Sequence, residues 1–503
     1  MKFLKMLSRR VVIIILLILI QAAWLLVSFT KLAMHAVWIQ VLLTLLSLIM
    51  VLFIMKKDDN PSYKIGWILI IMAAPIFGGL LYLFFAGHHP TRWMRRKLEE
   101  GKQKIRPHLI HEQPMPEGRA AATMHYIQKY GPYPAWQNTE TRYFPVGEKM
   151  YEQMLKDMKQ ARHYIFLEYF IITDGSMWQE ILEVLKQKVK EGVEVRVIYD
   201  DFGSLGRIPD QYYKTLESFG IKAMTFNPLV PFVSMVMNNR DHRKILVIDG
   251  HTAYNGGINL SDEYINRIHP YGHYKDTGVR YHGEAVWNFT LMFLEMWNAF
   301  RPEDENFGPF RPSVHHPEAF QGQGWVQPFS DSPLDDETVA ENVYLELIQQ
   351  AEKYVDIFTP YLAIDNEMQT ALCMAAKRGV KVRLLIPAVT DAKVTHMLTH
   401  SYLESLIRAG VRVYEYSPGF IHAKSFVVDD KLAVVGTINM DYRSLYLHFE
   451  CGALHYQTTA VQQLKQDAED SFRQSREITL DDCRRGFFHT LFDAVLRVIA
   501  PLM

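Results

Sequence analysis

Cysteine is scarce in this chain of 503 residues. Cys373, Cys451 and Cys483 are the three present, no two of them form a Cys-x-x-Cys pair, and their number is odd. This spacing argues against both a disulfide framework and a zinc site. We therefore expect three thiols, buried or at the surface, in a reducing compartment.

A charge excess of either sign is also missing. Lysine plus arginine total 54 and aspartate plus glutamate total 55, so the net charge is −1. Proteins that follow a nucleic-acid backbone usually carry a basic excess. The balance counts against a nuclease, and no nucleic-acid partner is expected.

Three long stretches contain no charged side chain: residues 11–30, 36–55 and 65–87. Each has about the 20 residues that an α-helix needs to cross the hydrocarbon core of a bilayer. Pro75, Gly78 and Gly79 lie in the third stretch, but helices tolerate such residues better in a membrane than in water. The first stretch is too long for a cleaved signal peptide and lacks an Ala-x-Ala site. Residues 1–90 are predicted to be a transmembrane region of a multi-pass protein of the cell membrane.

The flanking basic residues leave the orientation of these spans open. Four precede the first span and seven follow the third: Lys2, Lys5, Arg9, Arg10, Arg92, Arg95, Arg96, Lys97, Lys102, Lys104 and Arg106. Basic flanks favour the cytoplasm, and three full crossings cannot place both flanks there. Either one stretch re-enters or lies in the interface, or one flank breaks the rule. The heavier cluster favours a cytoplasmic catalytic region, unless it is only a solvated helix face.

Beyond residue 90 one pattern of apolar strands and amphipathic helices occurs twice. The predicted strands are 164–172 and 193–199 in the first copy, and 354–361 and 380–386 in the second. A helix lies between the strands of each pair, and such alternation implies parallel pairing and an α/β fold. We place a linker and lead-in at 91–142, the first domain at 143–310 and the second at 325–483.

The repeat is sharpest in a motif with the pattern H-x-K-x4-D-x6-G-x2-N. The first copy has His242, Lys244, Asp249 and Asn259, and the second has His422, Lys424, Asp429 and Asn439. Corresponding residues are 180 positions apart in every case. A single histidine on a strand is usually a core or surface residue. Two copies with identical internal spacing indicate a site.

An apolar, strand-like run follows each His-x-Lys, so the histidine and lysine of each copy face the same side of a strand. If the copies pack about a pseudo-twofold axis, the two imidazole–ammonium pairs converge on one cleft. Lys244 and Lys424 would balance the charge of a phosphodiester. One histidine would attack phosphorus, while the other would protonate the leaving alkoxide and deprotonate the acceptor.

The lysines take the part of a cationic clamp, so no metal is required. Asn259 and Asn439 would add neutral donors that bind substrate. Carboxylates should orient the imidazoles and fix their tautomers. Four candidates are present, and the sequence does not pair them with the histidines: Asp249, Asp276, Asp429 and Glu450.

These residues resemble the paired HxKxxxxD motifs of the phospholipase D superfamily. Four further segments are similar to its bacterial cardiolipin synthase family: 238–245 (NNRDHRKI), 256–264 (GGINLSDEY), 275–283 (KDTGVRYHG) and 436–445 (GTINMDYRSL). The resemblance covers nearly the whole chain. It implies an α/β fold of two repeats, with mixed sheets flanked by helices and one shared active site, after N-terminal transmembrane helices.

The resemblance also implies an activity. A phosphatidyl group would pass from one phosphatidylglycerol to another, giving cardiolipin and glycerol through a phosphohistidine, with no cofactor. His242 would be the nucleophile and His422 the acid. The chain departs from the family at 361–365 (YLAID), which lacks a proline, and at Tyr254-Asn255. Either departure could alter lipid selection.

Other interpretations remain open. The nearest is a phospholipase D that hydrolyses phospholipids, which differs only in what attacks the phosphohistidine. A non-enzymatic alternative is a membrane scaffold with an inactive site. Residues 484–503 are either a terminal core helix or a helix that lies on the membrane, with an apolar face made of Phe487, Phe488, Leu491, Phe492, Val495, Leu496 and Ile499. The oligomeric state is not revealed.

Overall fold

The computed structural model describes residues 15–23, 26, 33–86, 92–109, 115–228, 239–334, 337–484 and 486–502. The chain divides into two compact units, each with its own hydrophobic core. The helical unit comprises Met1–Pro90, Leu229–Asn238 and Phe487–Met503, and the sheet unit comprises Thr91–Pro228 and Asn239–Gly486.

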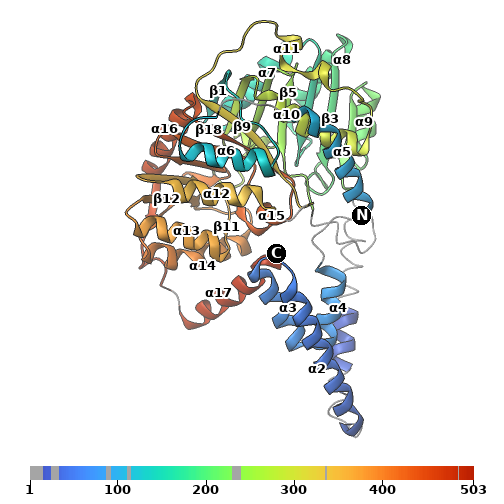
Figure 1. Ribbon diagram of the computed structural model, residues 1–503, viewed down its shortest axis with the longest axis vertical. Helices are drawn as coiled ribbons and strands as arrows, with labels where there is room; N and C mark the ends of the chain where they lie inside the picture. Colours follow the sequence, from blue (N-terminus) through green and yellow to red (C-terminus); the bar gives the residue numbers. More distant parts are fainter. Residues whose placement is uncertain are drawn as a thin grey trace. The chain divides into compact units, whose positions relative to one another are not determined.

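Two large mixed sheets form the sheet unit (Figure 1). The first consists, in spatial order, of β1 (Thr139–Phe144), β8 (Gly278–Gly283), β6 (Thr252–Gly256), β5 (Lys244–Ile248), β2 (Tyr164–Tyr169), β3 (Glu194–Asp200) and β4 (Lys222–Phe226). The second consists of β9 (Trp325–Asp331), β18 (Glu450–Tyr456), β16 (Leu432–Gly436), β15 (Ser425–Val428), β10 (Tyr354–Phe358), β12 (Lys381–Pro387), β13 (Arg412–Tyr416) and β19 (Ser475–Ile478).

The first seven strands of each sheet follow the same order, so the duplication read from the sequence is also a duplication of topology. β2, β3 and β4 run parallel, as do β10, β12 and β13. The α/β fold with two repeats and parallel strand–helix–strand units is thus confirmed. The helices that flank the sheets are α7 (Gly147–Gln160), α8 (Ser176–Lys190), α9 (Tyr212–Ser218), α10 (Val286–Phe300), α12 (Val339–Gln350), α13 (Asn366–Lys377), α14 (Lys393–Arg408) and α16 (Thr459–Arg473).

The two halves of the sheet unit are joined through backbone and side chains. A short parallel pair links β7 (His273–Lys275) of the first half to β14 (Gly419–Ile421) of the second. Asn255 donates a hydrogen bond to the buried Cys451 Sγ at 3.1 Å across the same junction. Cys373, Cys451 and Cys483 are all free thiols.

The segment 91–142, which we expected to be a linker and lead-in, contains two helices that belong to the sheet unit. α5 (Arg92–Leu109) packs on α10, and α6 (Arg119–Tyr130) packs on α12. The inner face of α5 buries Met94, Leu98 and Ile105, spaced for one side of a helix. β1 also begins within this segment, at Thr139. The segment is therefore more than a linker, because these apolar side chains complete the core.

In the helical unit, α2 (Ala33–Lys56) covers the second expected span, and its segment Val37–Lys56 is long and apolar enough to cross a membrane. The third expected span is not one helix. α3 (Pro61–Ala73) ends before Ala74, whose φ of −142° and ψ of 81° are not helical, and α4 (Pro75–Phe85) begins at the proline. Proline disfavours the helical conformation of the residue before it, which explains the break. Of the first expected span, residues 15–23 and 26 are helical, and the rest lies outside the described residues.

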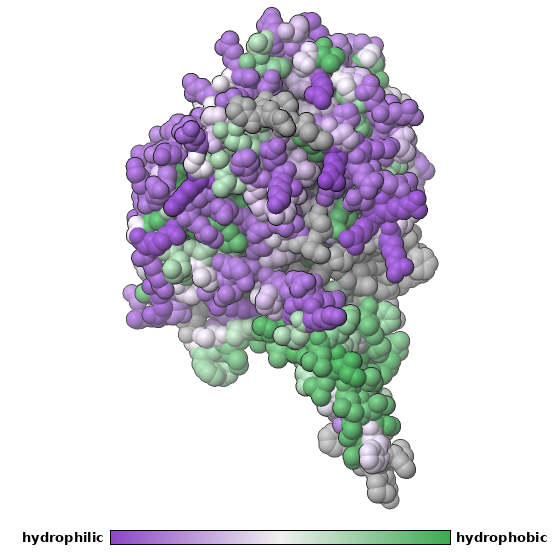
Figure 2. All heavy atoms as spheres, in the orientation of Figure 1, coloured by the Kyte–Doolittle hydropathy of each residue, from purple (hydrophilic) through white to green (hydrophobic). Residues whose placement is uncertain are grey.

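The surface of the helical unit is rich in apolar side chains, whereas the face of the sheet unit seen in Figure 2 is mainly polar. α17 (Phe487–Ile499) contacts α3 and exposes five large apolar side chains of the predicted apolar face: Phe487, Phe488, Leu491, Phe492 and Val495. Leu496 of that face is buried. This exposure is unlike that of a terminal core helix.

Candidate active site

Each half of the sheet unit places its His-x-Lys motif at the start of a fully buried strand. Lys244 begins β5 and Lys424 precedes β15, and each strand pairs antiparallel with β2 or β10. The ammonium group of Lys244 donates to the backbone carbonyl of His242 at 2.6 Å, and that of Lys424 donates to the carbonyl of His422. Each lysine side chain therefore contacts the backbone of its own histidine, and both lysines are almost fully buried.

Each histidine takes its carboxylate partner from the opposite half. His242 Nδ1 lies 2.8 Å from Glu450 Oε1, and His422 Nδ1 lies 2.6 Å from Asp276 Oδ2. The backbone repeats this exchange: the His242 amide donates to the carbonyl of Phe449, and the His422 amide donates to that of Lys275. Because Nδ1 faces a carboxylate in both cases, Nε2 is the nitrogen left for chemistry.

Both histidines line one cavity of about 540 Å³, together with Asn259 and Asn439. The structure thus brings the two halves of the motif together at a single site. Aromatic rings stand edge-on to the imidazoles: Phe170 lies 5.0 Å from His242 and Tyr264 lies 5.3 Å from His422, centroid to centroid. These contacts restrict how the imidazoles tilt.

Burial in a cationic setting lowers the pKa of both imidazoles. Burial and the charge of Lys244 hold the pKa of His242 well below its usual range. Burial and Lys424 also lower the pKa of His422, although Asp276 opposes them. Burial lowers the pKa of Lys244 to about 8 and that of Lys424 to about 7. Burial raises the pKa of Glu450, whereas the charge of Lys244 and the hydrogen bond from the Thr437 hydroxyl act to lower it.

Asp249 and Asp429, two of the four candidates to orient the histidines, do not do so. The Asp249 carboxylate accepts from the backbone amides of Arg162, His163 and Tyr164 at 2.7–2.9 Å. Asp429 accepts in the same way from the three residues that lead into β10. Each lies at the far end of β5 or β15, seven residues and roughly 23 Å of extended chain from its histidine. They fix the loops before β2 and β10, which corrects the catalytic assignment we expected.

The two asparagines have different surroundings. Asn259 accepts from the Ile171 amide at 3.1 Å and donates to Tyr264 Oη at 2.8 Å, so its amide is already held by protein. The side-chain oxygen of Asn439 has no hydrogen-bond partner within the described chain. Asn439 is therefore the better placed of the two to receive a substrate group.

In each motif, the residue that follows the first glycine of the turn lies beside the carboxylate that pairs with a histidine. A Cβ added at Gly257 would lie 2.2 Å from Asp276 Oδ1, so only glycine leaves room for that carboxylate. The equivalent residue of the second copy is Thr437, whose hydroxyl instead donates to Glu450. Two segments depart from the family pattern. In the first, Tyr361 lines the cavity. In the second, Asn255 is not a cavity residue and donates hydrogen bonds to the carbonyl of Lys244 and to Cys451 Sγ.

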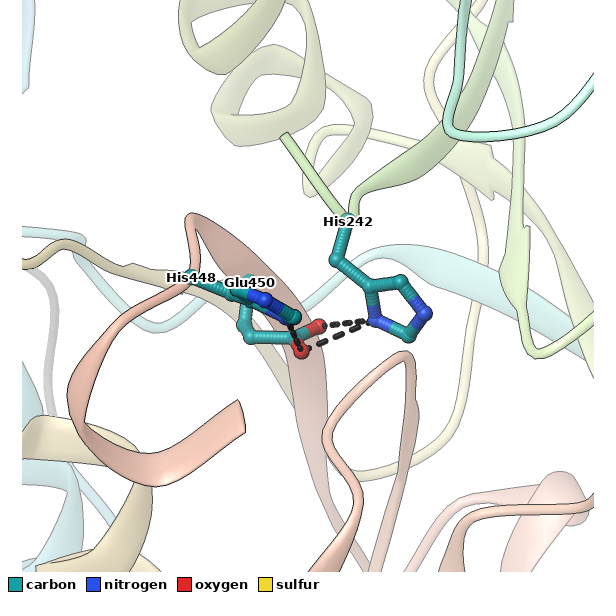
Figure 3. A group of neighbouring side chains, drawn as sticks. All are labelled: His242, His448 and Glu450. Carbon is teal, nitrogen blue, oxygen red and sulfur yellow. Dashed lines mark hydrogen bonds and ion pairs between the residues drawn. The ribbon is translucent and has the colours of Figure 1, made fainter. Parts of the chain in front are cut away.

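One cavity residue was not anticipated from the sequence. His448 lies between α15 (Tyr442–Tyr446) and β18, its ring centroid 5.6 Å from that of His242 (Figure 3). Its Nδ1 is 3.9 Å from Glu450 Oε1. It stands two residues before Glu450, so strand alternation was a signal that could have placed both on one side.

Two groups of side chains in the described chain have the spacing of metal ligands. One is His242, His448 and Glu450, and the other is His396, His400 and Glu415. In the first, Lys244 lies close to the same atoms and opposes a cation. In the second, Glu415 already pairs with Arg476 at 2.8 Å. Neither charge setting favours a divalent ion.

Comparison with known proteins gives two family matches. The family described as cardiolipin synthase, phospholipase D-like domain, matches residues 154–272 and 344–471. A phospholipase D-nuclease N-terminal family matches residues 42–87. The phosphatidylserine synthase of Haemophilus influenzae has a similar fold, with a TM-score of 0.57 at 14% identity, over 76% of this chain and 99% of that one.

Relatives of known sequence extend the match to nearly the full length. The chain is 44% identical over 460 residues to an uncharacterized protein of Streptococcus mutans, covering 90% of this chain and 99% of that protein. It is 32% identical over 475 residues to a cardiolipin synthase of Alkalihalophilus pseudofirmus, covering 92% and 94% of the two chains. The chain therefore belongs to the cardiolipin synthase family of phospholipase D-like proteins.

Proposed function

We propose that this protein transfers a phosphatidyl group from one phosphatidylglycerol to another, giving cardiolipin and glycerol. The observation that carries the proposal is the reciprocal pairing of His242 with Glu450 and of His422 with Asp276 around one cavity. An uncharged His242 suits the nucleophile, and His422, whose protonated form Asp276 favours, suits the acid.

In the first half-reaction, His242 Nε2 attacks the phosphorus of the donor lipid. A nitrogen–phosphorus bond forms as the bond from phosphorus to the head-group oxygen breaks. His422 enters this step as an imidazolium whose charge Asp276 stabilises, gives its Nε2 proton to that oxygen and becomes neutral, and glycerol leaves. Lys244 and Lys424, whose ammonium groups bond the backbone carbonyls of the two histidines, would offset the charge that builds on the phosphoryl oxygens.

In the second half-reaction, His422 takes a proton from the acceptor hydroxyl of another phosphatidylglycerol. That oxygen attacks phosphorus, and the bond to His242 breaks. One phosphodiester replaces another, so the exchange is nearly isoenergetic. Water must be kept from the phosphohistidine for transfer to prevail. A lipid surface at the cavity would favour a lipid alcohol over water as acceptor.

We further propose that residues 1–90 hold the enzyme in the membrane and that the sheet unit is cytoplasmic. α2 supplies one crossing of sufficient length. The break between α3 and α4 suits a re-entrant or interfacial segment, which would reconcile the two basic flanks. Tagging the chain ends and the loop at Asp58 for protease accessibility in sealed vesicles tests this topology.

The activity is tested with purified protein and phosphatidylglycerol in detergent, with lipid products resolved by mass spectrometry. We expect a four-chain lipid and free glycerol, and no product from His242→Ala or His422→Ala. Phosphatidic acid as the main product would instead identify a hydrolase. Activity retained by His242→Ala would overturn the assignment of the nucleophile.

A further inference from the structure

His448 is a buried polar side chain that the proposed reaction leaves unused. Its side chain is 10% exposed, and neither ring nitrogen has a hydrogen-bond partner within the described chain. It lines the cavity shared by His242 and His422. Leaving buried polar groups unpaired is costly, so the missing partner is expected to come from whatever fills the cavity.

The surroundings of His448 determine what that partner can be. Burial, followed by the charges of Arg443, Arg240 and Lys244, holds its pKa well below the usual range. An uncharged imidazole has one N–H donor and one acceptor nitrogen. Nδ1 is turned toward Glu450, as Figure 3 shows, so the proton is favoured there and Nε2 is the acceptor.

An acceptor nitrogen does not bind a phosphate oxygen, which has no proton to give. It binds a hydroxyl. The transfer reaction presents such a group twice, because the acceptor attacks along the line by which the leaving alcohol departed. The same part of the cavity therefore holds a glycerol head group in both half-reactions.

We propose that His448 determines head-group specificity by accepting a hydrogen bond from a hydroxyl of the lipid head group. The proposal rests on the phosphatidyl-transfer function, but the contact belongs to the head group and not to the reacting phosphorus. His448 is thus a substrate-binding residue, and the reaction itself is left to His242 and His422.

The test compares two donor lipids with isotopically labelled acyl chains: phosphatidylglycerol, and phosphatidylpropanol, whose head group has no free hydroxyl. In a ping-pong reaction, kcat/KM for the donor reports the first half-reaction alone. The wild type should prefer phosphatidylglycerol. His448→Leu should lower kcat/KM for phosphatidylglycerol about tenfold, the effect of one lost hydrogen bond. The same substitution should leave kcat/KM for phosphatidylpropanol unchanged.

Two variants complete the design. His448→Asn retains an acceptor oxygen and should keep most of the preference for phosphatidylglycerol. His125→Leu, an exposed histidine on α6, should behave as wild type. Equal losses on both donors in His448→Leu, or no preference in the wild type, would overturn the proposal. If the wild type yields labelled phosphatidic acid instead of cardiolipin, the transferase function fails, yet the donor ratio still tests His448.

Discussion

At the scale of single residues, the two histidines are held by carboxylates of different length, and the turns beside them compensate. Asp276 reaches His422 only because Gly257 has no side chain. The longer side chain of Glu450 reaches His242 and also accepts a hydrogen bond from the Thr437 hydroxyl. The site is therefore symmetric in role and asymmetric in its details.

Gly257→Ala is expected to displace Asp276 and to lower kcat by about 10²-fold, the lower end of a general acid–base contribution. The added methyl group would meet Asp276 Oδ1, so the histidine loses its orientation while the fold persists. Turnover and thermal unfolding are measured together. Gly486→Ala is the control, since nothing lies within 4 Å of its Cβ position. Full turnover by Gly257→Ala would show that Asp276 is dispensable.

Asp249→Asn should destabilise the protein without disabling its chemistry. The substitution weakens three backbone contacts that fix the loop before β2, at a cost of about 1–3 kcal/mol. Glu450→Gln should do the reverse, with a small change in Tm and a large loss of kcat. Activity per folded molecule separates the two effects. A catalytic loss in Asp249→Asn at unchanged Tm would restore that residue to the active site.

The alkaline side of the pH profile should report the buried lysines. Burial lowers the pKa of Lys424 to about 7 and that of Lys244 to about 8. Below these values both are charged and attract the phosphodiester; above them the charge is lost. We expect kcat/KM, which reports the free enzyme, to fall as pH rises through this range. Lys424→Arg should shift the fall to higher pH, because a guanidinium stays charged.

The sequence predicted the residues of the site better than their pairing. Alternation along a strand was enough to place His242 with Lys244 and His422 with Lys424. It could not show that Asp276 and Glu450 cross to the opposite half, because that pairing depends on how the two sheets meet. Asp249 and Asp429 were misassigned because their fixed spacing reflects a loop contact.

At the scale of elements, the buried strands were easy to predict and the amphipathic helices at the edges were not. α5 buries Met94, Leu98 and Ile105, but the many basic residues between them concealed the helical spacing. The break between α3 and α4 follows from Pro75, whose effect within a long apolar run was underestimated. Local composition misled in both cases: tertiary packing decided the place of α5, and the backbone restriction imposed by proline decided the break.

The exposed face of α17 is expected to lie in the lipid head-group region. Phe488 is 82% exposed on α17, and an apolar helix face of this kind binds at a membrane interface. A nitroxide label at position 488, in a variant without the three native cysteines, should be accessible to oxygen and shielded from a water-soluble nickel complex. A label at His489, on the polar side, is the control. Equal nickel accessibility at both positions would contradict membrane contact.

At the scale of the whole molecule, the duplicated fold makes one active site from two incomplete ones. Neither half holds both an imidazole and the carboxylate that orients it, since His242 depends on Glu450 and His422 on Asp276. A single chain contains all four groups, and the parallel pairing of β7 with β14 fixes the two halves together. The duplication is therefore a requirement of the chemistry and not only a trace of ancestry.

Mixing His242→Ala and His422→Ala chains should restore no activity, because each variant lacks one of the two motif histidines that line the shared cavity. If two chains instead exchanged halves, as in a domain-swapped dimer, one site of each mixed pair would regain both histidines. An equimolar co-expressed mixture would then reach about a quarter of the wild-type rate, as expected for random pairing. Cardiolipin formation from phosphatidylglycerol measures the outcome, with each variant alone as the baseline. Because His242 meets Glu450, and His422 meets Asp276, within one chain, we expect the mixture to stay at that baseline.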